Sequence, residues 1–230
     1  EEKKIEEMDV VFLMDRFGYA KTVDVATYER NKEAANTENR YILTCKNTDK
    51  ICIFTNKGQM HLLKVLDLPY GKFRDKGTPI DNLSNYNSSE ENFVYITNLA
   101  AISHSQVLFG TKSAMLKVVD GSEFDVAKRT TAATKLNEGD ELIFVQALAL
   151  EETLVMQSKK DLFIRIEISS IPEKKKGAVG VRGMKLGAGD ALAAIYLLNA
   201  EDVVNIEVKG KEVALNRLRT AGRDTKGTKR

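Results

Sequence analysis

The sequence predicts an all-β protein built from about five repeated units, and three observations support this. Short apolar runs alternate with polar turns, and helical periodicity is weak. Five hairpin turns, marked by Gly18, Gly58, Ser113, Lys160 and Gly210, follow one another at intervals of 40, 55, 47 and 50 residues. Residues 135–142 also match residues 185–192 at an offset of 50. Such a period, with several strands in each unit, is typical of a propeller.

Each unit begins with a hairpin of two apolar strands around a polar turn. A short polar segment follows, then a loop rich in Lys, Gly or Thr, and then a strand that leads into the next unit. Residues 28–40 are polar and irregular, and they indicate a loop or a brief helix. Five hairpins imply five four-stranded blades. The expected strand pairs are 10–14 with 19–23, 51–54 with 60–65, 107–109 with 115–119, 153–156 with 162–166, and 203–208 with 213–215.

Charge divides the chain into three parts. With 43% hydrophobic residues and a net charge of +2, the chain can bury a core, and its net charge alone does not indicate a nucleic-acid partner. Residues 1–9 carry −3 and residues 209–230 carry +6. We therefore expect an acidic linker over 1–8, the folded domain over 9–220 and a basic tail over 221–230. No apolar run approaches the length of a membrane span, about 20 residues, so no membrane association is expected, and the cytoplasm is the expected compartment.

Catalytic and metal chemistry find little support in the sequence. Cys45 and Cys52 flank a turn and make no disulfide framework. They are expected as core thiols that face each other across a strand pair, with a structural bridge between them as the alternative. His61 lies between apolar neighbours in a strand, and His104 lies between two serines. No nucleophile elbow or dinucleotide fingerprint is present, and an active site in a central channel is disfavoured because no polar cluster is common to the repeats. No catalytic residue, metal or cofactor is therefore expected in this domain.

Basic loops are the recurrent feature that points to function. Between Pro172 and Lys185, five cations accompany one acid, and weaker versions of this loop recur along the chain. Cations repeated along a curved edge can neutralise successive phosphates of duplex DNA, and nearby glycines let backbone N–H groups approach them. No helix carries a base-reading cluster, so we expect positional, sequence-tolerant contacts. Strand residues Lys21, Lys64, Lys117 and Arg165 are further candidates for this edge. The main candidate contacts are Lys72, Arg74, Lys76, Lys128, Arg129, Lys135, Lys174, Lys175, Lys176, Arg182, Lys185, Arg219, Arg223, Lys226, Lys229 and Arg230.

Several motifs carry a resemblance to a known family. Residues 180–190, Gly-Val-Arg-Gly-Met-Lys-Leu-Gly-Ala-Gly-Asp, closely resemble a loop in the C-terminal domain of bacterial DNA gyrase A subunits. Residues 17–21, followed by Tyr28-Glu29, and segments 76–83 and 219–227 resemble other parts of that domain in the same order. The related A subunit of topoisomerase IV shares the architecture. The resemblance covers nearly the whole chain, from about Met8 onward.

This resemblance implies a β-pinwheel, a propeller-like disc in which neighbouring blades exchange strands, with duplex DNA bound around the outer rim. In gyrase such a domain wraps DNA and supports ATP-dependent negative supercoiling, whereas in topoisomerase IV it tunes substrate choice and decatenation. The resemblance also implies that the parent protein is a type IIA topoisomerase A subunit. It would work as an A-subunit dimer with an ATPase B subunit, and ATP and Mg²⁺ would bind elsewhere. The isolated domain is expected to be monomeric.

One departure from the family pattern bears on function. Gyrases carry a Gln-Arg-Arg-Gly-Gly-Lys-Gly box after the Tyr-Glu segment, but here residues 30–39 contain no glycine and two acids. Many gyrases also have six blades, whereas five are counted here. We therefore favour a topoisomerase IV-like domain that binds and bends DNA. A gyrase A domain that wraps DNA is the alternative, and a propeller that binds a protein through one face is the second alternative.

Overall fold

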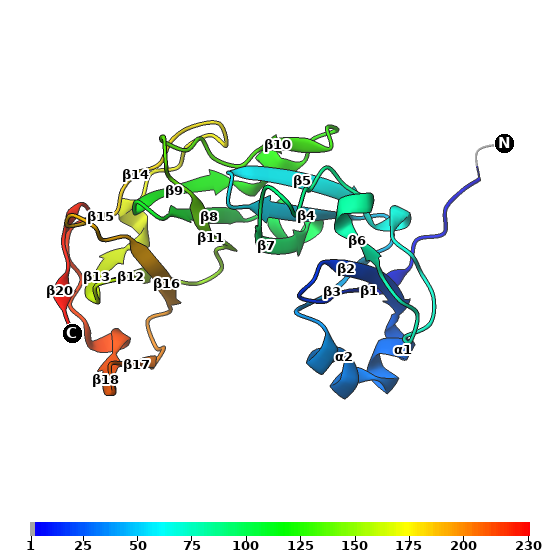
Figure 1. The fold of residues 1–230 in the computed structure, drawn as a ribbon, viewed down its shortest axis with the longest axis horizontal. Helices are drawn as coiled ribbons and strands as arrows, with labels where there is room; N and C mark the ends of the chain where they lie inside the picture. The colour runs from blue at the N-terminus through cyan, green and yellow to red at the C-terminus, as the bar shows by residue number, and fades with distance from the viewer. Residues whose placement is uncertain (1–2) are drawn as a thin grey trace.

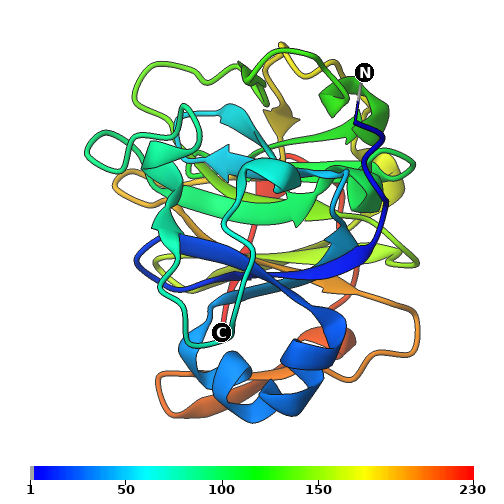
Figure 2. The ribbon, with the colours of Figure 1, turned by 90° about the vertical axis from the view of Figure 1, so that its right-hand side faces the viewer.

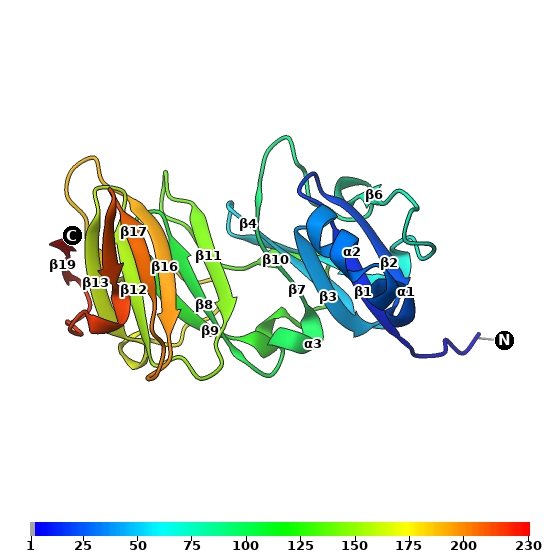
Figure 3. The same ribbon diagram turned by 90° about the horizontal axis from the view of Figure 1, so that it is seen from below.

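The computed structural model describes residues 3–230, which form four four-stranded antiparallel sheets and a final hairpin along an open arc (Figure 1). All five expected hairpins are present. Seen from below, the sheets stand next to one another like the blades of a propeller (Figure 3). The first sheet has the order β3-β1-β2-β6 and the second β10-β5-β4-β7; the third has β11-β8-β9-β14 and the fourth β16-β12-β13-β20. The all-β prediction is confirmed.

The strands of the first two sheets are mostly six residues long. The first sheet contains β1 (Asp9–Met14), β2 (Tyr19–Asp24), β3 (Tyr41–Lys46) and β6 (Thr78–Pro79). The second contains β4 (Lys50–Thr55), β5 (Gln59–Lys64), β7 (Phe93–Asn98) and β10 (Thr130–Ala132). Between them lie α1 (Val25–Arg30), α2 (Lys32–Glu38), α3 (Leu99–Ile102), and the 3-10 turns η1 (Val65–Asp67) and η2 (Ile80–Asn82).

The later units repeat this arrangement. The third sheet contains β8 (Gln106–Thr111), β9 (Met115–Asp120), β11 (Leu142–Ala147) and β14 (Val181–Arg182). The fourth contains β12 (Thr153–Ser158), β13 (Leu162–Glu167), β16 (Leu192–Leu198) and β20 (Thr228–Lys229). The fifth unit has only β17 (Asn205–Val208) and β18 (Lys211–Ala214), and β15 (Met184–Lys185) pairs in parallel with β19 (Thr225–Lys226). The 3-10 turns η3 (Gly121–Phe124), η4 (Ile168–Ser170) and η5 (Leu215–Arg217) follow the third, fourth and fifth hairpins.

Each four-stranded sheet borrows one strand from the unit that follows it in the chain. After the hairpin β4–β5, the chain runs back to add β6 beside β2, and then returns to add β7 beside β4. The same excursion places β10 beside β5, β14 beside β9 and β20 beside β13. The borrowed strand is the outer edge of each sheet on the convex side of the arc, as Figure 1 shows for β10 and β20. The strand exchange that the family resemblance implies is therefore present.

The hydrophobic core lies between successive sheets, which explains why the strands are apolar without interruption. Along β4, Ile51 and Ile53 pack toward the first sheet, while Cys52 and Phe54 pack toward the third. Since both faces of an inner strand are buried, both sets of alternating side chains must be apolar. The two cysteines are buried and free, but they do not face each other. Cys45 belongs to β3 of the first sheet, whereas Cys52 pairs within the second, because the chain changes sheets at the turn between them.

Two short helices cover the outer face of the first sheet, which has no preceding sheet to pack against (Figure 2). The Asp24 carboxylate caps α1 by accepting a hydrogen bond of 2.6 Å from the Thr27 N–H. Ala35 of α2 is fully buried against Val11, Leu13 and Val23 of the sheet. The polar segment 28–40 is therefore helical for the most part, and it ends the core on this side.

Two aspartates explain the match between residues 135–142 and 185–192. Gly139 and Gly189 turn the chain with φ of 80° and 72°, a region that favours glycine. The Asp140 carboxylate then accepts hydrogen bonds from the backbone N–H of Ser113, at 2.9 Å, and of Glu141. Asp190 makes the equivalent bond of 3.1 Å to the N–H of Lys160. Each aspartate thus ties the loop before a return strand to the hairpin turn of the same blade.

The structure corrects two expectations at the C-terminal end of the chain. The fifth unit has two strands where four were expected. In the second to fourth units a return strand follows the donated strand, whereas in the fifth unit the donated strand β20 is the last strand of the described residues. Residues 221–230, expected as a basic tail outside the domain, instead supply β19 and β20, the latter as the outer strand of the fourth sheet. Of the acidic linker expected over 1–8, residues 3–8 are exposed and outside any strand, and residues 1–2 lie outside the described part.

Gly180 provides a test of the strand exchange. A Cβ at this position would lie 2.6 Å from the carbonyl oxygen of Leu116 on the recipient strand β9, whereas a Cβ at Gly177 in the same loop would meet nothing within 4 Å. We expect Gly180→Ala to lower the free energy of unfolding by about 1–3 kcal/mol, the usual cost of overpacking, and Gly177→Ala to leave it nearly unchanged. Urea denaturation of the two variants compares them directly. Equal stability would contradict the close backbone approach.

Candidate nucleic-acid interface

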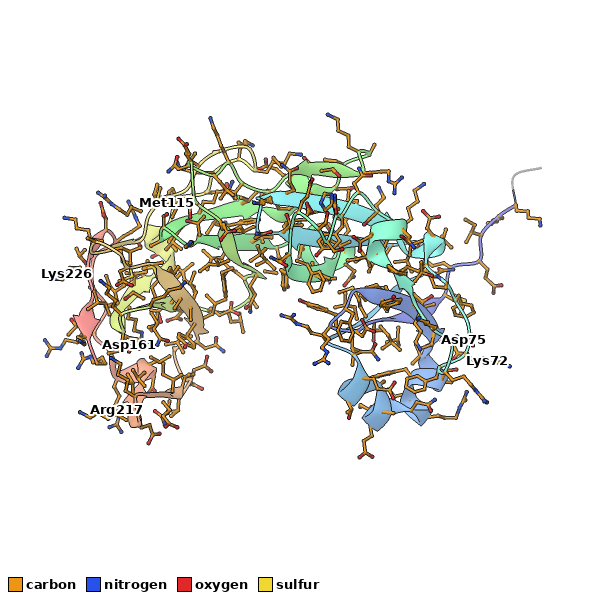
Figure 4. All side chains as sticks on the ribbon, viewed as in Figure 1. Lys72, Asp75, Met115, Asp161, Arg217 and Lys226 are labelled. Atoms are coloured by element: carbon orange, nitrogen blue, oxygen red, sulfur yellow. The ribbon has the colours of Figure 1, made fainter. Side chains whose placement is uncertain are left out.

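The basic loops lie at the convex edge of the arc because each one immediately precedes or carries a donated strand. One lies before β6, one before β10, one before β14 and one around β19 and β20. In Figure 4, Lys72 and Lys226 mark this edge on opposite sides of the arc. The predicted cations are therefore repeated at successive blade junctions, where a long charged ligand could contact several of them. Twelve of the fifteen main candidates before Arg230 are exposed; Lys174, Lys176 and Arg223 are partly buried.

Four of the candidate cations are engaged in bonds within the protein. The Arg129 guanidinium donates to the Leu83 carbonyl at 3.0 Å, and the Lys176 ammonium donates to the Glu123 carbonyl at 3.1 Å. Arg182 forms an ion pair of 2.5 Å with Asp224, which lowers the pKa of that carboxyl. Arg223 donates to the carbonyls of Ser170 and Arg182. These side chains hold the loops to neighbouring segments, and they are less free to turn toward a ligand.

The other candidates are exposed, apart from Lys174, which is partly buried. Lys76 lies over the Tyr19 ring, with its nitrogen 5.1 Å from the ring centroid, and keeps its charge at the edge. Within residues 3–230, the remaining side chains donate no hydrogen bond to the protein and form no ion pair; they are Lys72, Arg74, Lys128, Lys135, Lys174, Lys175, Lys185, Arg219, Lys226, Lys229 and Arg230. These eleven residues are called the free cation set of the convex edge.

A shallow groove beside β13 gathers five cations at one end of the edge. Arg165, Arg219, Lys226 and Arg230 line it together with Arg217, and no acidic residue is among its lining. Arg217 was not among the residues expected from the sequence, since it follows a hairpin in the short turn η5 and not in a basic loop. The groove brings together residues from three segments, a grouping that spacing along the chain does not indicate.

Three strand-borne cations lie beneath the loops, and the expectation that they belong to the contact surface needs correction. Lys117 is 1% exposed, and its ammonium group donates to three carbonyls of the loop above it. Lys21 donates to the Phe73 and Asp75 carbonyls, and Arg165 donates to the Asn216 and Leu218 carbonyls at 2.9 and 3.1 Å. These carbonyls hold their head groups because the donated segment runs directly over their strands, although Arg165 still lines the groove beside β13. Lys64 alone among the four is exposed.

His61 is the third residue of β5, as Lys21 is of β2 and Lys117 is of β9, and its side chain is buried. Its Nδ1 lies 2.8 Å from the Thr130 hydroxyl and its Nε2 lies 2.5 Å from a Glu91 carboxylate oxygen. His104 is exposed in a turn. Over residues 3–230, no group of three or more His, Cys, Asp or Glu side chains is arranged to hold a metal ion. No helix in the same range is long and apolar enough to span a membrane.

Comparisons with known proteins agree with this architecture. Residues 105–149 and 152–199 each match the family model described as "DNA gyrase C-terminal domain, beta-propeller". Each match covers one unit, from its hairpin to its return strand. The gyrase A subunit of Lawsonia intracellularis is 30% identical over 86% of this chain and 25% of its own length. That of Escherichia coli K12 is 27% identical over 98% of this chain and 27% of its own length. This chain thus spans about a quarter of the length of these relatives.

Solved structures show the same fold. The C-terminal domain of DNA topoisomerase IV matches with a TM-score of 0.85 and 20% identity, over 98% of this chain and 73% of that one. The E. coli ParC C-terminal domain matches with a TM-score of 0.79 and 14% identity, over 96% and 94% of the two chains. A DNA gyrase A C-terminal domain matches with 0.63 and 17%, over 96% and 76%.

Donated outer strands and a repeated blade of this kind define a β-pinwheel fold. The resemblance to the C-terminal domains of DNA gyrase and topoisomerase IV A subunits, which the sequence motifs indicated, is confirmed by the family model, the relatives and the solved structures.

Two neighbouring lysines in the third basic loop differ in their contacts: one is free at the surface and the other is bonded within the protein. Lys175 is exposed without a side-chain partner, whereas Lys176 is tied to Glu123 through both its backbone N–H and its ammonium group. We expect Lys176→Gln to lower the free energy of unfolding by about 1 kcal/mol through the lost hydrogen bond, and Lys175→Gln to leave it within about 0.5 kcal/mol of the wild type. Chemical denaturation distinguishes them, and the reverse order would refute this division of roles.

Proposed function

We propose that this domain binds duplex DNA along the convex edge of the arc, without reading its sequence, and bends it. The observation that carries the proposal is the free cation set, which recurs beside the donated strands β6, β10, β14 and β20. Phosphates also recur at intervals along a duplex, and cations that neutralise them release the counterions bound to the DNA. In the described residues, the longest helix, α2, has seven residues and lies against the first sheet, so no helix is offered to the major groove.

The parent protein is proposed to be the A subunit of a type II topoisomerase that changes DNA topology by passing one duplex through another. The domain would present DNA to the cleavage core of an A-subunit dimer, with an ATPase B subunit as the further partner and with ATP and Mg²⁺ bound outside this domain. The isolated domain is proposed to be monomeric and non-catalytic, and the parent protein to act in the bacterial cytoplasm. The kinship of the chain with gyrase A subunits and with topoisomerase IV domains supports these proposals.

The helix α2 favours DNA bending over gyrase-like wrapping. It occupies the place of the glycine-rich gyrase box, and its Ala35 is buried against the first sheet. A segment committed to this packing cannot extend over DNA as a flexible basic loop would. We therefore infer a topoisomerase IV-like role in substrate choice. The gyrase-like alternative, wrapping for negative supercoiling, draws support from the gyrase A relatives. If the domain does not bind DNA, the alternative function is that of a propeller that binds a protein partner.

Salt dependence and charge reversal test the DNA surface. Binding to a linear duplex of mixed sequence should weaken steeply with salt, with a log–log slope of about −0.9 per phosphate contact and several contacts in total. Reversing Lys72, Lys175 and Lys226 to Glu should weaken binding by at least tenfold, roughly 1.4 kcal/mol or more. Reversing Lys57, Lys159 and Lys211, which are exposed at hairpin turns or on β18, changes the net charge equally and is the control. A flat salt slope, or equal losses in the two triple variants, would refute the edge model.

The topology of a closed plasmid separates bending from wrapping. If the domain only bends DNA, relaxation by a nicking–closing topoisomerase in its presence should leave the linking number of the product unchanged. Shortened end-to-end distances in a fluorescently labelled linear duplex would then report the bend itself. A linking-number shift that grows with protein concentration would instead support the gyrase-like alternative.

A further inference from the structure

Lys117 is a buried cation beneath the most basic loop of the domain. Its side chain is 1% exposed, and its ammonium group donates three hydrogen bonds, of 3.0, 3.0 and 2.9 Å, to the carbonyls of Lys175, Lys176 and Ala178. The Phe109 ring lies below, 5.6 Å from the nitrogen. Within residues 3–230 no carboxylate lies within ion-pair distance of it. The three N–H donors of a lysine ammonium are therefore matched by three backbone acceptors.

These bonds fix how the loop faces the solvent. The loop begins beside β9, where the Lys174 N–H donates to the Val118 carbonyl at 2.8 Å, and it ends where Gly180 lies against the backbone of Leu116. Between these points, the carbonyls of Lys175, Lys176 and Ala178 turn inward to one ammonium group, while the Lys175 side chain is exposed and that of Lys174 is partly exposed. Lys117 is thus placed to hold the middle of the loop in one conformation.

We propose that Lys117 is a positioning residue of the DNA surface, which holds the loop 173–180 in the conformation that offers Lys174 and Lys175 to phosphates, and that bound DNA in turn favours its protonated state. The proposal rests on the DNA binding proposed above. A neutral amine has two donors and a lone pair, so deprotonation would break one bond and set the lone pair against a carbonyl oxygen. The loop would then lose its anchor while keeping its own charges.

Burial and the charged groups around Lys117 determine the pH at which its ammonium group loses a proton. Burial, the largest cause, lowers the pKa of Lys117 to about 8; Lys174 lowers it further, and Glu123 on η3 raises it. Lys175 and Lys176 are the other charges of the loop, Arg182 follows on β14, and β8 faces the nitrogen with the neutral Phe109. DNA phosphates outside the loop would offset the neighbouring lysine charges, and so would favour the ammonium form.

The stability of the fold and the affinity for DNA should change with pH in opposite directions, so the two effects can be distinguished. Between pH 8 and the ordinary lysine pKa of about 10.4, the unfolded chain binds the proton that the native Lys117 has lost, so the contribution of this group to stability rises with pH. The affinity for DNA should instead be greatest below pH 8 and fall above it. A loss of affinity in this range therefore cannot be the result of this group destabilising the fold.

The test measures duplex affinity from pH 7 to 9.5 at constant ionic strength. Wild-type affinity should fall by about tenfold, the loss of one hydrogen bond to a charged group, with a midpoint near pH 8. Lys117→Met should bind weakly and without this step, and Lys117→Arg, which stays charged, should lack the step as well. Lys57→Met, which removes an exposed lysine at a hairpin turn, should retain the wild-type profile. A wild-type profile without a step, or a step that persists in Lys117→Met, would overturn the proposal.

A spectroscopic measurement keeps the proposal falsifiable if the variants do not fold. The Cε resonance of Lys117 in ¹³C-lysine-labelled wild-type domain should titrate near pH 8 alone and at a higher pH with duplex bound. An unchanged midpoint would refute the coupling. The same samples separate this failure from that of DNA binding: a wild type without salt-dependent binding at pH 7 refutes the proposed function, whereas binding without pH dependence refutes only the role of Lys117.

Discussion

Strand donation is the constraint on which the rest of this structure depends. Each of the four sheets is completed by a strand from the following unit, so no sheet is closed by its own segment of chain. The cores between successive sheets require both faces of the inner strands to be apolar, and the first sheet, without a predecessor, is covered by α1 and α2. Because the donated strand forms the outer edge, the loop that leads to it lies on the convex side. The position of the basic loops is thus a consequence of topology.

The hairpins could be predicted from sequence because their information is local. An apolar run, a turn and a second apolar run are adjacent in the chain, and the turns use positive-φ residues such as Gly58 and Gly210. The donated strands could not be predicted in this way. Strands of two residues, such as Val181–Arg182, show no periodicity, and their partners lie far away in sequence. For the same reason residues 221–230 resembled a tail, although β20 completes the fourth sheet.

The candidate interface was predictable in its composition and not in its detail. A run of lysines between glycines indicates a charged loop wherever it occurs, and these loops lie at the edge as expected. Which cations are free depends on carbonyls supplied by distant segments. Arg129 donates to the Leu83 carbonyl, and Lys117 is held inward by carbonyls 58 to 61 residues away in the chain. The helix α2 likewise depends on a packing face that only the sheet provides, since its polar sequence alone left a loop possible.

The interlocking of blades has a consequence for how such domains change in size. One unit consists of a hairpin, a strand donated to the preceding sheet and a return strand that pairs with the unit's own hairpin, as in residues 105–149. Removing or duplicating one whole unit leaves each four-stranded sheet with a following unit that can donate its outer strand, so these sheets stay complete. The number of blades can therefore vary in evolution by recombination at equivalent points, without redesign of any core. The length of the convex edge, and with it the length of duplex it can follow, would change in steps of one blade.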